Sequence, residues 1–175
     1  MKSKKPAAPA KKSKSPDWNR LADRRLARLI SSAEAESGLR KLGPKARPWQ
    51  VQLRLIGSAT MKQLNAAYRG KDYATDVLSF PAPEVFRREM GILGELVICL
   101  PTLKAQAKAE KHPPEVELNV LLAHGLLHLL GLDHERGAKE AATQRRWENR
   151  LLEAAFGKKF AGLIERNNSS IKGHE

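Results

Sequence analysis

The sequence contains a single cysteine, Cys99, among its 175 residues. A disulfide within the chain is therefore excluded, and one thiol fits a reducing compartment. Cys99 ends an apolar, strand-like run, which predicts a buried and inert thiol. The chain also lacks an apolar run long enough to cross a membrane, and its first residues lack the apolar core of a secretory signal. We therefore expect a cytoplasmic protein with no membrane partner.

Acidic residues are absent from residues 1–16, which hold six lysines mixed with proline, alanine and serine. Such a segment cannot bury a core, so it is predicted to be a disordered tail, and residues 167–175 a frayed C-terminal tail. Of the formal net charge of +13, the first tail carries +6 and the rest of the chain +7. A basic body favours nucleic acid as the partner. The lysine tail itself is either a solubilising extension or a tether to a polyanion.

The pattern of apolar residues predicts one domain over residues 17–166. Asp17 and Ser58 are predicted to cap helices, and a loop containing Pro81 and Pro83 is predicted between the last two strands. The predicted helices cover about 21–38, 59–68, 115–130 and 139–156, and the predicted strands 49–56, 76–80 and 92–100. This order describes an α+β fold, in which several helices pack on a small mixed β-sheet.

Three histidines stand in the stretch LLAHGLLHLLGLDH, residues 121–134, with the spacing H-x3-H-x2-G-x2-H. A helix places His124 and His128 on one face, a turn apart. Gly131 permits the positive φ that ends a helix, so that the returning chain can bring His134 beside the other two. Three neutral imidazoles form an open zinc site, which predicts one Zn²⁺ per chain. Because the helix is apolar on most faces, we expect it to be the central, metal-bearing helix.

Two other functions are compatible with three histidines. The first is a zinc hydrolase that acts on peptides or small molecules, since metzincin proteases share the histidine spacing. These proteases use a glutamate as general base directly after the first histidine, where this chain has Gly125. The second is a non-catalytic binding module with a structural zinc. Structural zinc sites usually have four protein ligands, often cysteines, and no cysteine lies near the motif. His112 could serve as a fourth ligand only if the fold brought it back.

A second polar cluster precedes the strand predicted at residues 76–80. Arg69 and Lys71 could contact phosphate, and Thr75 and Asp76 stand where the loop enters the strand. From spacing alone, the cluster is either a charged turn or a phosphate-binding site. Glu95 is likewise either a solvated carboxylate or a group that supports the histidines.

Three segments carry a resemblance to a known family. The motif H-G-x-L-H-L-x-G-x-D-H of residues 124–134 resembles the signature of the YbeY family of bacterial rRNA maturation endoribonucleases. Residues 64–81 and 91–99 are similar to two further blocks of that family. The resemblance implies an α+β fold, one zinc ion, cleavage of single-stranded RNA, formation of the 3′ end of small-subunit rRNA, and ribosome quality control. It also implies the small ribosomal subunit as a partner, with assembly factors such as an Era-type GTPase or a small-subunit ribosomal protein. With this resemblance, the non-catalytic alternative is a ribosome-assembly factor.

Residue by residue, the resemblance places the zinc ligands at His124, His128 and His134 and the catalytic arginine at Arg69. No other cofactor is implied. Asp133 is then a candidate either to orient a ligand imidazole or to cap the returning turn. The chain departs from the family pattern at two positions. Glu95 replaces an aspartate, so a hydrogen bond from this position to the histidine site is not carried over. Ala74 replaces a proline, which should loosen the turn before Thr75.

Overall fold

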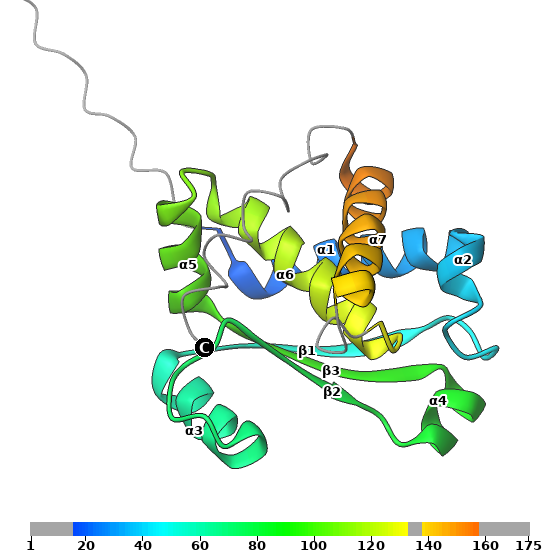
Figure 1. Cartoon of the computed structure of the whole chain (residues 1–175), viewed down its shortest axis with the longest axis horizontal. Helices are drawn as coiled ribbons and strands as arrows, with labels where there is room; N and C mark the ends of the chain where they lie inside the picture. The colour runs from blue at the N-terminus through cyan, green and yellow to red at the C-terminus, as the bar shows by residue number, and fades with distance from the viewer. Residues whose placement is uncertain (1–15, 133–137, 158–175) are drawn as a thin grey trace, which may run out of the picture.

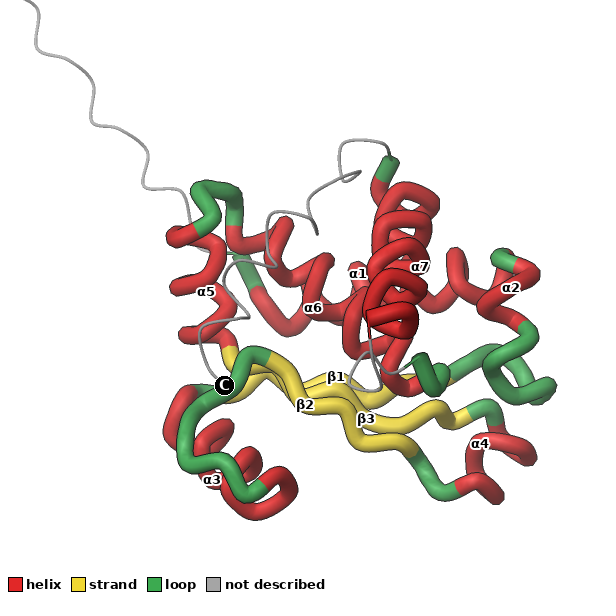
Figure 2. Tube along the Cα trace, in the orientation of Figure 1, coloured by secondary structure: helices red, strands yellow, loops and turns green. Residues whose placement is uncertain are grey.

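The computed structural model describes residues 16–132 and 138–157 (Figure 1). The predicted tails therefore lie outside the described residues, apart from Pro16. Figure 2 shows helices gathered around one small sheet, which confirms the predicted α+β class. In chain order the elements are α1 (Trp18–Ala35), α2 (Ser37–Arg40), β1 (Gln50–Ile56), α3 (Ser58–Arg69), β2 (Val77–Pro81), α4 (Glu84–Met90), β3 (Ile92–Cys99), α5 (Leu100–Ala109), α6 (Pro114–Leu129) and α7 (Ala138–Phe156).

The sheet has the strand order β1-β3-β2. The central strand β3 runs parallel to β1 and antiparallel to β2, so the sheet is mixed, as predicted. Side chains alternate along β3: Leu96 and Ile98 join the larger core under the helices α1, α6 and α7, while Val97 and Cys99 join a smaller core with Met61 of α3. The predicted burial of Cys99 is therefore confirmed. No helix in the described part is long and apolar enough to span a bilayer.

The helix α6 lies at the centre of the molecule. It contacts α1, α5, α7, β2 and β3, and Figure 1 shows it above the sheet between α5 and α7. A helix enclosed on most sides needs apolar residues around its circumference, and α6 has them. At its C-terminus Gly131 adopts φ +88°, and the N–H groups of Gly131 and Leu132 donate to the carbonyls of His128 and Leu127. These two bonds form the glycine-terminated helix end that the sequence predicts.

Four local predictions are wrong. The segment predicted as a loop between the last two strands contains the helix α4, which begins directly after Pro83. The strand predicted to end at Leu100 stops at Cys99, and α5 follows with Pro101 in its first turn. In both helices proline stands at the start, where its missing N–H costs nothing, and not as a breaker. The first helix ends at Ala35 rather than near Gly38, and the N-cap of α3 is Gly57, with Ser58 as the first helical residue.

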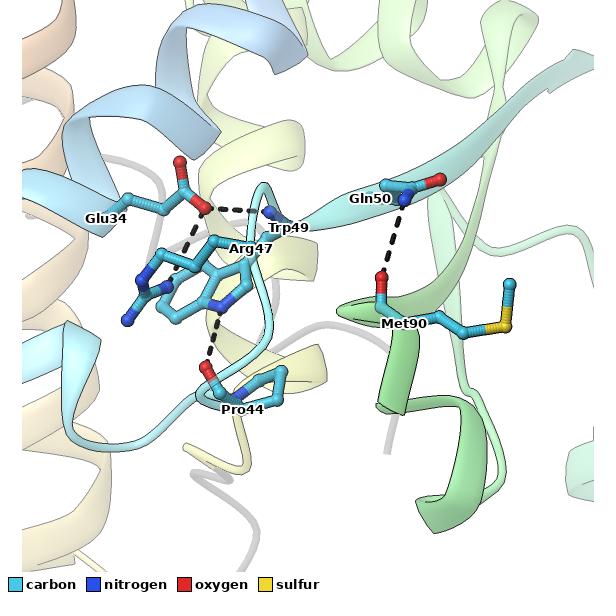
Figure 3. A network of polar contacts seen from close by, with 6 residues as sticks. All are labelled: Glu34, Pro44, Arg47, Trp49, Gln50 and Met90. Carbon is cyan, nitrogen blue, oxygen red and sulfur yellow. Dashed lines mark hydrogen bonds and ion pairs between the residues drawn. The ribbon is translucent and has the colours of Figure 1, made fainter. Parts of the chain in front are cut away.

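A network of polar contacts around Trp49 fixes the chain where β1 begins (Figure 3). The backbone N–H of Trp49 donates to Glu34 Oε1 of α1 at 2.7 Å, and its indole N–H donates to the carbonyl of Pro44 at 3.1 Å. The Arg47 guanidinium lies 4.5 Å from the indole centroid and pairs with Glu34. Gln50 Nε2 donates to the carbonyl of Met90 at the end of α4. The first strand is thereby attached to α1 on one side and to α4 on the other.

Candidate active site

Two of the three predicted metal ligands lie side by side on α6. The rings of His124 and His128 have centroids 4.6 Å apart and planes inclined by 58°, and both side chains are partly exposed. The four-residue spacing on a helix is the cause of this proximity. His134 and Asp133 lie outside the described residues. Within residues 16–132 and 138–157, no group of three histidine, cysteine, aspartate or glutamate side chains could hold a metal ion. The three-histidine zinc site therefore stays a prediction.

A buried carboxylate from another helix contacts the first of these histidines. Glu148 of α7 places Oε1 2.6 Å from Nδ1 of His124. Gln144, one turn earlier on α7, places Nε2 3.1 Å from the same carboxylate oxygen and 3.1 Å from the same ring nitrogen. The sequence analysis did not single out either residue. The available signal was their position: α7 buries Leu151, Leu152 and Ala155, and Gln144 and Glu148 continue that buried stripe with polar side chains.

The contact between His124 and Glu148 shifts the pKa of both groups. Burial lowers the pKa of His124, but the hydrogen bond and negative charge of Glu148, with a smaller contribution from Asp76, reverse the effect and raise it above the ordinary value. Burial raises the pKa of Glu148, but the donors on His124 and Gln144 overcome this and lower it. Glu148 is therefore an ionised hydrogen-bond acceptor at neutral pH. In neutral His124 the proton then resides on Nδ1, which leaves the lone pair on Nε2, and such an imidazole fits the donor set that zinc prefers.

The residue after His124 lies against the sheet. Gly125 is buried, and a Cβ at this position would lie 2.7 Å from Cδ2 of Leu96 and 3.3 Å from Oγ of Ser79. The side chain of any other residue would therefore enter the packed space between α6 and the sheet. A glutamate base of the metzincin kind has no room there. This observation counts against the peptidase alternative more strongly than the missing glutamate alone.

The second polar cluster divides into an exposed part and a fixed part. Arg69 is the last residue of α3, and Arg69 and Lys71 are exposed on either side of Gly70, which ends the helix with φ +68°. Asp76 is fixed: Oδ1 accepts from the N–H of Val77 at 2.7 Å, and Oδ2 accepts from Gln106 Nε2 at 2.9 Å. Asp76 thus organises the entry to β2, while Arg69 has the exposure that contact with a phosphate requires.

Two further candidates have other partners. Glu95 of β3 forms an ion pair with Arg54 of the neighbouring strand β1. His112 precedes α6, and its Nε2 lies 3.0 Å from Oε2 of the buried Glu117. Since α6 rises about 1.5 Å per residue, the helix start lies roughly 15 Å from His124. The fold therefore does not bring His112 back to serve as a fourth ligand.

Comparison with known proteins decides the family. The family described as "Endoribonuclease YbeY" matches residues 11–155 of this chain. The chain belongs to the YbeY endoribonuclease family. This membership confirms the family predicted from the sequence and, with it, the predicted enzyme class, a nuclease.

Individual relatives agree with the assignment to the YbeY family. An Endoribonuclease YbeY of Leptospira interrogans serogroup Icterohaemorrhagiae serovar Lai (strain 56601) is 41% identical over 124 residues, which cover 62% of this chain and 88% of the relative. One from Alkalilimnicola ehrlichii (strain ATCC BAA-1101 / DSM 17681 / MLHE-1) is 40% identical over 127 residues, covering 71% of this chain and 72% of the relative. The solution structure of TM1509 from Thermotoga maritima superposes with a TM-score of 0.56 at 26% identity, covering 86% of this chain and 91% of that one.

Proposed function

We propose that the chain is a zinc-dependent endoribonuclease that cleaves single-stranded RNA, forms the 3′ end of small-subunit rRNA and takes part in ribosome quality control. The observation that carries the proposal is the pair His124 and His128, one of them held by a buried carboxylate, in a member of the YbeY family. The specific rRNA substrate, the small ribosomal subunit, an assembly factor such as an Era-type GTPase or a small-subunit ribosomal protein, and a cytoplasmic location rest on the family resemblance.

Each candidate residue has a separate task in this proposal. His124, His128 and His134 would hold the zinc and leave one coordination place open to substrate. Zinc, when bound, supplies Lewis-acid polarisation of a phosphoryl oxygen. Arg69 would contact the scissile phosphate with its planar donors and stabilise the negative charge that builds up on the oxygens during cleavage. The exposure of Arg69 at the end of α3 supports this role.

An exposed aromatic residue beside Arg69 supports the preference for single strands. Tyr68 of α3 is 68% exposed, and its ring meets Phe80 of β2 edge-on, at 4.9 Å between centroids. Unpaired bases stack on exposed aromatic rings, whereas bases within a duplex are already stacked on each other. Ser79, which precedes Phe80 on β2, lies on the opposite face of that strand, against Gly125. Because β2 is an edge strand, one flexible RNA strand crossing that edge could contact both faces.

The change Tyr68→Ala is expected to weaken binding of single-stranded RNA by about 5- to 150-fold, since stacking on one aromatic ring contributes roughly 1–3 kcal/mol per base. The dependence of affinity on salt concentration should stay the same, because no charge is removed. Fluorescence anisotropy with a labelled single strand measures both quantities. Phe86→Ala is the matched control, because Phe86 is also an exposed ring but lies on α4. Equal affinities for the Tyr68→Ala variant and the wild type would remove this support.

The proposed function is tested by metal analysis coupled to a substrate comparison. We expect the purified chain to contain about one zinc ion per chain and to cleave single-stranded RNA, but neither duplex RNA nor casein. A chelator should abolish cleavage, and added zinc should restore it. Cleavage that persists in the fully metal-free protein would contradict zinc dependence. Hydrolysis of casein in place of RNA would favour the peptidase alternative.

A further inference from the structure

Glu148 and Gln144 have no part in the function as proposed so far, although both contact the His124 imidazole. We infer that Glu148 is a positioning residue, which holds His124 in the tautomer with its proton on Nδ1 and aims Nε2 at the metal, while Gln144 holds Glu148 in place. The inference rests on the proposed function, because it concerns the same zinc site. It adds to the site a residue from α7, a helix that contributes none of the three predicted ligands.

The burial of Glu148 and Gln144 makes the hydrogen bond between His124 and Glu148 necessary. Glu148 is 4% exposed and Gln144 is 2% exposed, so water does not readily replace their protein partners. An ionised carboxylate buried in this way is unfavourable unless it accepts hydrogen bonds. The donors that the structure gives to Oε1 are the Nδ1–H of His124 and the amide of Gln144. Rotation of the His124 ring away from Glu148 would remove the shorter of these two bonds.

The amide orientation of Gln144 follows from the same contacts. Its Nε2 lies 3.1 Å from both Oε1 of Glu148 and Nδ1 of His124, and with the proton on Nδ1 the carboxylate oxygen is the acceptor of the two, so the amide donates to Glu148. In this orientation Oε1 of Gln144 is buried without a hydrogen-bond partner in the described part of the chain.

A purely structural role explains these residues less well. The neighbouring buried positions of α7 are filled by Leu151, Leu152 and Ala155, and another apolar residue at position 148 would pack α7 on α6 without a desolvation cost. Buried ion pairs are often no more stabilising than apolar residues of similar size. Zinc-binding histidines, in contrast, usually donate their second ring N–H to a carboxylate or carbonyl, which fixes the tautomer and the ring orientation.

The tautomer of His124 can be measured in the wild-type protein without metal. Nitrogen NMR of ¹⁵N-labelled imidazoles, recorded at alkaline pH where the ring carries one proton, should show that proton on Nδ1 of His124. The change Glu148→Gln should lower the population of this tautomer, since an amide oxygen is a weaker acceptor than a carboxylate. A proton on Nε2 in the wild type overturns the inference, whatever the variants do.

Zinc affinity provides the second measurement. By competition with a chromogenic chelator, Glu148→Gln should bind zinc about 10- to 100-fold more weakly than the wild type. The matched control is Glu153→Gln, which makes the same change at an exposed position of the same helix and should leave the affinity unchanged. Thermal unfolding of the metal-free proteins shows whether each variant is folded. A folded Glu148→Gln variant with wild-type zinc affinity overturns the inference.

His124→Ala separates failure of this inference from failure of the proposed function. If His124→Ala loses zinc but Glu148→Gln does not, Glu148 has no positioning role, and the zinc site stands. If His124→Ala retains wild-type zinc, the proposed site is wrong, and the positioning role falls with it.

Discussion

Replacing His124 or His128 with alanine is expected to remove the zinc ion and to abolish RNA cleavage. Each substitution deletes one of the three proposed ligands, and two imidazoles hold zinc much more weakly than three. The loss of affinity should exceed about 100-fold, because even residues that only orient a ligand contribute about 10- to 100-fold. Zinc content by elemental analysis and the rate of cleavage of a single-stranded RNA measure the two effects. Both should fall together in each variant.

His112→Ala is the matched control, since it also removes one imidazole close to α6. His112 pairs with Glu117 at the start of that helix, away from the other two histidines. Its removal should leave zinc content and cleavage unchanged, although the loss of a partner for the buried Glu117 should lower the melting temperature. Wild-type zinc content and cleavage in both the His124→Ala and His128→Ala variants would refute the proposed site. If the variants lose zinc but still cleave RNA at the wild-type rate, the metal has no catalytic role.

The histidine pair could be predicted from the sequence because its geometry is local. A spacing of four residues in a helix fixes which side chains are neighbours, and the order of apolar residues shows that the helix is enclosed. The end of α6 at Gly131 depends on the same short-range rules. The α+β class follows from the order of the elements, which is likewise visible along the chain.

The residue that contacts the histidine pair from another helix could not be predicted from the sequence alone. Glu148 lies 24 positions from His124, and only the packing of α7 against α6 brings the two together. The pairing of Glu95 with Arg54 depends on the register of β1 against β3, which the pattern of either strand does not determine. The helices α4 and α5 escaped prediction because proline at a helix start and proline in a loop look alike in a sequence.

Replacing Arg69 with alanine is expected to lower kcat for RNA cleavage by about 100- to 1000-fold, the usual effect of removing one donor that stabilises charge in the transition state. Zinc content should not change, because Arg69 belongs to α3 and the two described histidines to α6. Arg69→Lys should recover only part of the rate, since an ammonium group keeps the charge but not the planar pair of donors. Single-turnover cleavage at saturating RNA separates this effect from weaker binding.

Arg88→Ala is the control for the general loss of a positive charge, because Arg88 is exposed on α4, at the other end of the sheet from α3 (Figure 1). It should leave kcat unchanged. The Arg69→Ala variant also separates an enzyme from an assembly factor. An enzyme with this change should still bind ribosomal particles but fail to mature their rRNA, because binding draws on many contacts and cleavage depends on charge stabilisation at one phosphate. Normal rRNA maturation by Arg69→Ala would favour the non-catalytic assembly factor, with zinc as a structural ion.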